Sequence, residues 1–174
     1  MATHLTGLAW RLTFIAVIII QTEVPSFAQS GASQSAPCRP SVRAAAGMLQ
    51  PYLDEPWQFI GGGSVRACVT ERISVEPEIS VSPGSQFDRW TIVPNVLFDL
   101  RKPGGTIMPY AIFGAGYGSE SDNRFGFRRS YMVWYGGIGV RVSSNGHLFV
   151  APEFRIGDDL GSFLLGIGYH FSRP

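Results

Sequence analysis

Few side chains in this sequence have the types and spacing that enzyme chemistry requires. Beyond residue 28 the histidines are His147 and His170, and two carboxylates, Glu76 and Glu78, stand two residues apart. Carboxylates at i and i+2 share one face of a strand, so this pair could divide general acid and general base work. The same spacing is typical of an ion-paired or solvated strand face, which is the interpretation that we favour.

A second candidate is the sequence His170-Phe171-Ser172 near the end of the chain. It is similar to the His-x-Ser motif of the outer-membrane lipid A deacylases, a family of eight-stranded barrels. In that family a further strand carries the acidic triad partner, whereas this chain ends at Pro174. We therefore expect no catalytic residue, and no cofactor or metal site is indicated. His170 is expected to face the inside of a barrel or its rim.

Residues 1–28 have the pattern of a secretory signal peptide. Arg11 precedes an apolar run, Leu12 to Ile20, and Ser26-Phe27-Ala28 forms a small-x-small cleavage site. The apolar run is roughly half of the ~20 residues that a membrane-spanning helix needs, so an N-terminal anchor is the weaker alternative. Cys38 lies far past this run and follows Pro37, which argues against lipidation. We expect an exported chain without a lipid anchor.

The rest of the chain is long enough for one domain with its own core. We expect residues 29–41 to form a tether, rich in Ser, Ala and Gln, and residues 42–174 to form the domain. The net charge of +1 offers no basic surface for nucleic acid. The 21 glycines and 12 prolines argue against a helical bundle and favour many short strands.

About eight strand-like runs follow the tether. They cover residues 42–50, 57–67, 72–82, 90–101, 107–117, 131–142, 148–156 and 163–171. Residues 44–49 could instead form a helix turn. Alternation is clearest in 72–82, where Ile73 and Val75 share one face and Glu76 and Glu78 the other. Proline lacks the N–H that a ladder needs, so Pro77, Pro94, Pro109 and Pro152 count against regular sheet. A long barrel strand can absorb a proline at a bulge, and we keep these runs as strands.

The last run has one continuous apolar face that ends in aromatic residues. This face consists of Phe163, Leu165, Ile167, Tyr169 and Phe171. It resembles the closing strand of the bacterial outer-membrane β-barrel family, in particular the small OmpA/OmpX-type and opacity-type barrels; the tail 172–174 after the Phe is a departure. The resemblance implies an all-β fold, a single eight-stranded antiparallel up-and-down transmembrane barrel. It also implies a monomer in outer-membrane lipid, with a role in envelope structure, adhesion or leakage of small molecules.

The orientation of the alternating faces distinguishes two classes of barrel. In a lipid-embedded barrel the charged face fills the interior, where unpaired charges are costly, so we expect cross-strand ion pairs. The residues expected to point inward are Glu76, Glu78, Asp99, Arg101, Arg141, Glu153 and Arg155. In a soluble lipocalin-like barrel the same charges would face water around an apolar cavity. We favour lipid because aromatic residues stand at strand ends, as in interfacial belts: Trp57, Trp90, Tyr117, Tyr131 and Phe171.

The connections between runs alternate in character. Pro103-Gly104 and Asn145-Gly146 predict tight turns on the side of the termini. The longest connection, residues 118–130, is expected to be an extracellular loop. Its aromatic and basic residues could contact lipopolysaccharide phosphates or a surface partner, because guanidinium groups match phosphate geometry. These residues are Arg124, Phe125, Phe127, Arg128 and Arg129.

The two cysteines lie at positions that a hairpin would bring together. Cys38 precedes the first run and Cys68 follows the second, and both ends should lie at the same edge of the barrel. An exported chain meets an oxidising compartment, where neighbouring thiols pair. The sequence therefore predicts a Cys38–Cys68 disulfide.

Overall fold

The computed structural model describes residues 38–50, 56–84, 87–101, 105–122, 125–144, 147–158 and 161–171. The expected signal peptide, most of the expected tether and the tail 172–174 lie outside the described residues. No helix in the described part of the chain is long and apolar enough to cross a membrane.

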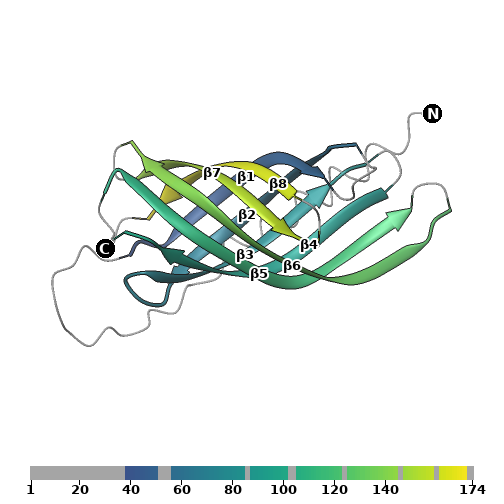
Figure 1. Ribbon diagram of the computed structural model, residues 1–174, viewed down its shortest axis with the longest axis horizontal. Helices are drawn as coiled ribbons and strands as arrows, with labels where there is room; N and C mark the ends of the chain where they lie inside the picture. The colour runs from purple at the N-terminus through teal and green to yellow at the C-terminus, as the bar shows by residue number, and fades with distance from the viewer. Residues whose placement is uncertain are drawn as a thin grey trace. The chain divides into compact units, whose positions relative to one another are not determined.

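Eight antiparallel strands close into a barrel, which confirms the predicted fold class (Figure 1). They are β1 (Ser41–Gln50), β2 (Gln58–Cys68), β3 (Ile73–Ser82), β4 (Phe87–Asp99), β5 (Ile107–Asp122), β6 (Arg128–Ser143), β7 (Leu148–Gly157) and β8 (Gly161–His170). Each strand pairs with its neighbours in sequence, and β1 closes the barrel against β8. Residues 44–49 belong to β1, so the alternative of a helix turn is wrong. The rim that carries Cys38 and Phe171 is called the terminal rim below, and the opposite one the hairpin rim.

The clearest departure from the expected boundaries is the hairpin of β5 and β6. The expected loop 118–130 is largely strand, because Gly118 pairs with Tyr131 and the ladder continues to Ser121 opposite Arg128. Beyond it, the backbone N–H of Asp122 donates to the carbonyl of Phe127. Gly126 has a φ of 71°, a conformation that glycine adopts easily. The polar composition of both strands here resembles a loop, although the backbone is paired.

The prolines are accommodated within the strands, and no β-bulge is present beside them. Pairing between β2 and β3 stops at Ser64↔Glu78 and resumes at Ala67↔Val75 in the same register, on either side of Pro77. Pairing is interrupted in the same way beside Pro94 and Pro152, again without an inserted residue. Pro109 lies within the unbroken ladder of β5 and β6. Each interruption therefore costs local hydrogen bonds and leaves the alternation of faces intact.

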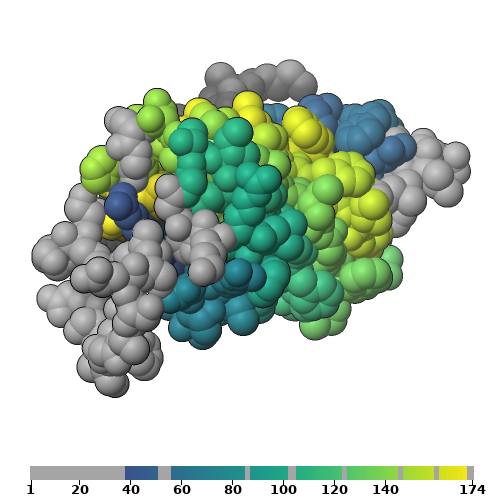
Figure 2. All heavy atoms as spheres, turned by 60° about the vertical axis from the view of Figure 1, so that its left-hand side comes forward, coloured from purple at the N-terminus to yellow at the C-terminus, as the bar shows by residue number. Residues whose placement is uncertain are grey.

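Side chains on the two faces of the wall have opposite character. Buried polar side chains point inward from every strand, for example Arg43, Arg66, Glu78, Asn95, Ser119, Arg141, Glu153 and His170. Exposed apolar side chains cover the outside of every strand, for example Val42, Phe59, Val81, Ile92, Phe113, Trp134, Phe154 and Ile167. Figure 2 shows the side chains of successive strands packed side by side on one face of this wall. Small apolar clusters, such as Leu49, Ile60 and Leu164, fill the interior between the polar groups.

Candidate functional site in the barrel interior

A cluster of five charged side chains occupies the middle of the interior. Arg43 of β1 contacts carboxylate oxygens of Glu76, Glu78 and Glu153, each at 2.9 Å. Arg155 of β7 donates to both oxygens of Glu78 at 2.8 and 2.6 Å and also contacts Glu153. All five are at least nine-tenths buried, and we call them the central cluster. Paired and hydrogen-bonded charges are the form in which a protein interior tolerates ionised groups.

Neutral groups complete the hydrogen bonding of the central cluster. The hydroxyl of Ser64 donates to Glu76 at 2.6 Å, and the hydroxyl of Tyr110 donates to Glu153 at 2.6 Å. The Tyr110 ring lies against Gly139, where a Cβ atom would stand only 2.4 Å from the ring. Glycine at this position therefore leaves the space that allows Tyr110 to reach Glu153.

A second group of charges lies between the central cluster and the terminal rim. Asp99 of β4 accepts from Arg66 of β2 at 2.7 Å and from Arg141 of β6. The guanidinium carbon of Arg141 lies 4.8 Å from the centre of the Tyr110 ring, within the range of a cation–π interaction. Tyr110 thus separates the two charged groups, with its ring against one and its hydroxyl on the other.

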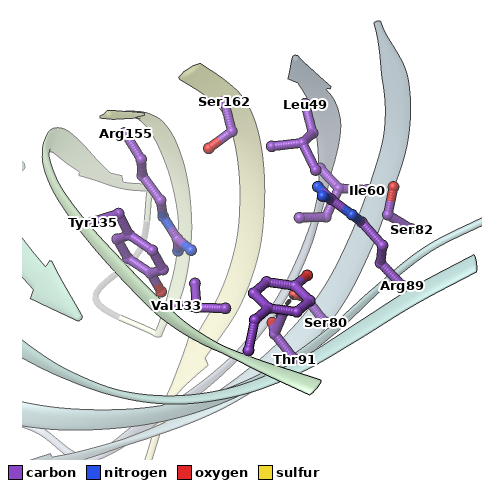
Figure 3. A pocket seen from close by; sticks show the side chains of 11 residues that line it. Leu49, Ile60, Ser80, Ser82, Arg89, Thr91, Val133, Tyr135, Arg155 and Ser162 are labelled. Carbon is purple, nitrogen blue, oxygen red and sulfur yellow. Dashed lines mark hydrogen bonds between the residues drawn. The ribbon is translucent and has the colours of Figure 1, made fainter. Parts of the chain in front are cut away.

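The hairpin rim holds a third pair and a small pocket. Arg89 contacts Glu120 at 3.3 Å and lies 5.7 Å from the Tyr131 ring. The pocket has a volume of about 40 Å³ and is lined by hydroxyl groups, two arginines and apolar side chains (Figure 3). Tyr131, expected in an outer aromatic belt, instead lines this pocket from inside the wall.

No protein-family model matches this chain, and no curated protein matches it. Solved structures do match it. The N-terminal β-barrel domain of Pseudomonas aeruginosa OprF is 14% identical, with a TM-score of 0.65 over 76% of this chain and 98% of that chain. Neisserial surface protein A is 13% identical (TM-score 0.61, 76% and 96% covered), and Ail, the attachment invasion locus protein of Yersinia pestis, is 15% identical (0.51, 76% and 97%). The chain has the fold of the small eight-stranded outer-membrane β-barrels.

Within this barrel, six of the seven charged residues expected to point inward do so. Glu76, Glu78, Asp99, Arg141, Glu153 and Arg155 are buried and take part in the contacts described above. Arg101 departs from the expectation, because β4 ends at Asp99 and Arg101 lies exposed beyond it. Sequence reasoning also missed Arg43, Arg66 and Tyr110. Their positions on the inward-facing sides of β1, β2 and β5 were the feature of the sequence that could have predicted their burial.

The residues considered for catalysis are engaged in ion pairs or in packing with aromatic rings. Glu76 and Glu78 both accept hydrogen bonds from buried partners, as an ion-paired strand face would. The ring of His170 packs 4.5 Å from that of Phe149, and the ring of His147 stacks 5.6 Å from Tyr169. Among the described residues no three His, Cys, Asp or Glu side chains are placed to hold a metal ion.

The residues considered for surface contact lie at the end of the β5–β6 hairpin. Phe125 and Phe127 are each 74% exposed. Arg128 and Arg129 are exposed as well, but they belong to β6 and not to a loop. Arg124 lies outside the described residues.

The Cys38–Cys68 disulfide is present at the terminal rim. The two Cα atoms are 5.9 Å apart, and the residues are separated by 30 positions in the sequence. The bridge joins Cys38, which precedes β1, to Cys68, the last residue of β2. It thereby ties the start of the barrel to its first hairpin.

Proposed function

We propose that this chain is a non-enzymatic β-barrel protein of the outer membrane of a Gram-negative-type bacterium, exported by its N-terminal segment. The observation that carries the proposal is the reversal of the usual distribution of residues, with buried polar side chains inside and exposed apolar side chains outside on all eight strands. Exposing such a surface to water would cost roughly 25 cal/mol per Å² of apolar area. Lipid removes this cost, and the ion pairs of the central cluster compensate the charges inside.

The two alternative functions have less support. A soluble lipocalin-like barrel needs an apolar interior that can hold a ligand, whereas the centre of this barrel is filled by the ionic contacts of Arg43 and Arg155. A lipid-modifying enzyme of this kind needs a base that activates a nucleophile, and His170, the candidate base, has its ring packed against Phe149. We therefore propose a role in envelope structure and surface contact, with outer-membrane lipid as the surrounding partner and a monomer as the working state.

Location is tested by fractionating cells that express the full chain. The protein should remain in the outer-membrane fraction after alkaline washing and should migrate differently on a gel before and after boiling. Mass spectrometry of the extracted protein should place its N-terminus at Gln29. Recovery as a soluble periplasmic protein would contradict the membrane assignment.

Substituting arginine on the outer wall tests the lipid contact directly. Ile167 is 61% exposed in the middle of β8. We expect Ile167→Arg to lower the free energy of unfolding in lipid vesicles by about 2–4 kcal/mol, the cost of a charge near the bilayer midplane. The measurement is a urea titration followed by gel mobility. Phe127→Arg, at the end of the hairpin, is the matched control and should cost less than about 1 kcal/mol. Equal effects of the two substitutions would argue against a bilayer around β8.

We further propose that the β5–β6 hairpin makes the contacts of this protein outside the membrane. With the terminal rim on the periplasmic side, this hairpin projects outward and presents exposed aromatic and basic groups together. Arginine pairs well with phosphate, and aromatic rings add apolar contact area. Lipopolysaccharide, or an anionic surface partner, fits this chemistry. Ail, an attachment invasion locus protein with the same fold, has a name that is in keeping with such a role.

Four substitutions in the hairpin test this contact without removing strands. The variant Phe125→Ser, Phe127→Ser, Arg128→Gln, Arg129→Gln should fold normally, because these side chains are exposed. Its binding to immobilised lipopolysaccharide should fall at least about tenfold, since losing one charge-assisted bond of ~1.5 kcal/mol already gives that factor. A control with Val69→Ser and Arg72→Gln at the terminal rim should bind normally. Unchanged binding by the hairpin variant would move the contact to the barrel mouth.

A further inference from the structure

The charged group nearest the terminal rim has more positive than negative charge. It comprises Arg66, Ser74, Asp99 and Arg141, which we call the basic layer; all four are at least nine-tenths buried. Ser74 projects from β3, between β2, which carries Arg66, and β4, which carries Asp99. Two guanidinium groups face a single carboxylate here, whereas the central cluster has three carboxylates and two guanidinium groups. Tyr110 lies between the two groups, with its ring against Arg141 and its hydroxyl on Glu153. The positive charge of Arg141 is thereby kept apart from the carboxylate of Glu153.

Hydrogen-bond donors in the basic layer outnumber the acceptors. Each oxygen of Asp99 already accepts from one arginine, Oδ2 from Arg66 and Oδ1 from Arg141. Four further buried polar atoms have no protein partner: Nε and Nη1 of Arg66, Nε of Arg141 and Oγ of Ser74. Guanidinium nitrogens can only donate, so this surplus needs acceptors. In the central cluster, by contrast, the buried side-chain nitrogens of Arg43 and Arg155 all have partners.

The kind of group that meets this demand follows from its own hydrogens. A water molecule would accept from the arginines, but it carries no charge and leaves the extra positive charge of the basic layer unbalanced. A small anion accepts without donating, and it also balances the extra positive charge. We propose that the basic layer binds a small inorganic anion of the size of chloride, held by Arg66, Arg141 and the hydroxyl of Ser74. This inference concerns the folded barrel itself and does not depend on the surface contacts proposed above.

The experiment compares anions at constant ionic strength. The full-length barrel, refolded in phosphatidylcholine vesicles, is unfolded with urea in sodium chloride, sodium bromide or sodium gluconate, whose anion is too large to enter. Above the dissociation constant, each tenfold rise in chloride or bromide should lower the unfolding equilibrium constant about tenfold relative to gluconate. Crystals grown in bromide should show an anomalous peak beside Arg66 and Arg141.

Two variants locate the effect. Arg66→Met leaves Asp99 paired with Arg141 alone, so the layer becomes neutral and should fold without halide dependence. Ser74→Ala removes one donor and should weaken halide binding while keeping both arginines. Arg89→Met, at the hairpin rim, is the control and should keep the full halide effect. Equal stability of the unmodified barrel in chloride and gluconate would overturn the proposal, and so would a halide effect that survives Arg66→Met unchanged.

Discussion

Glu153→Gln is expected to lower the free energy of unfolding of the refolded barrel by about 3–5 kcal/mol. The carboxylate is 1% exposed and accepts from Arg43, Arg155 and Tyr110. An amide keeps the shape but replaces one acceptor oxygen by an NH2 donor, so charge-assisted bonds from Arg43, Arg155 and Tyr110 are lost or weakened and buried donors face one another. Urea titrations in lipid vesicles, followed by gel mobility, measure the difference from the unmodified chain.

Glu120→Gln provides the matched control for this prediction. Glu120 also faces an arginine from a strand of the same barrel, but it lies at the hairpin rim and its side chain is 13% exposed. Its loss should cost less than the loss of Glu153, because its contact with Arg89 is longer, at 3.3 Å, and lies partly exposed at the rim. If Glu153→Gln costs no more than Glu120→Gln, the central cluster does not contribute to stability as its geometry indicates.

Removing the disulfide is expected to have the second largest effect. Cys38→Ser with Cys68→Ser opens a loop of 30 residues, which corresponds to about 3–4 kcal/mol in the chain-entropy model. The barrel should still fold, because β1 still pairs with β2 inside the opened loop and with β8 outside it. The same vesicle titration measures the loss, and reductant should lower the stability of the unmodified chain to that of the double variant.

The comparison requires that the bridge forms during export. Thiol labelling of the unreduced, denatured protein should detect no free cysteine. Two reactive thiols per chain would rule out the bridge in cells. A double variant as stable as the parent would show that pairing of β1 with β2 and β8 already fixes the terminal rim.

The strand content and the inward faces of β3, β4 and β7 could be predicted because their two faces differ strongly in polarity. In β3, for example, Glu76 and Glu78 alternate with Val75 and Ile79. The same contrast is missing in β1 and β2, where small residues surround the buried arginines. Arg43 is followed by Ala44-Ala45-Ala46, and Arg66 follows a Gly61-Gly62-Gly63 run. Alanine and glycine give little contrast in polarity between the two faces of a strand, so the inward orientation of the two arginines could not be predicted.

The β5–β6 hairpin shows a second limit of pattern analysis. Towards its end Ser119, Glu120 and Ser121 are polar on both faces, although the backbone remains paired to β6. Alternation records a difference between two environments. Where both faces of a strand carry polar residues, no alternation appears, and the sequence of a paired strand resembles that of a loop.

The partners of each charge could not be read from the sequence either. Arg43 meets Glu78 and Glu153, which are 35 and 110 residues away. Which side chains share a level inside a barrel depends on strand tilt and stagger, and these are set by the closure of the whole sheet. The sequence therefore predicts which charged residues point inward, but it does not predict which of them form ion pairs with one another.

The long separations within the central cluster also determine the order of events during folding. Arg43 stands on the first strand and Glu153 and Arg155 on the seventh, so no nascent hairpin contains a complete set of partners. A chain that entered the bilayer strand by strand would carry uncompensated charges at each step, and chains dominated by distant contacts fold slowly. Insertion and closure of β1 on β8 should therefore occur together, with the charged residues shielded from lipid until the last strand arrives.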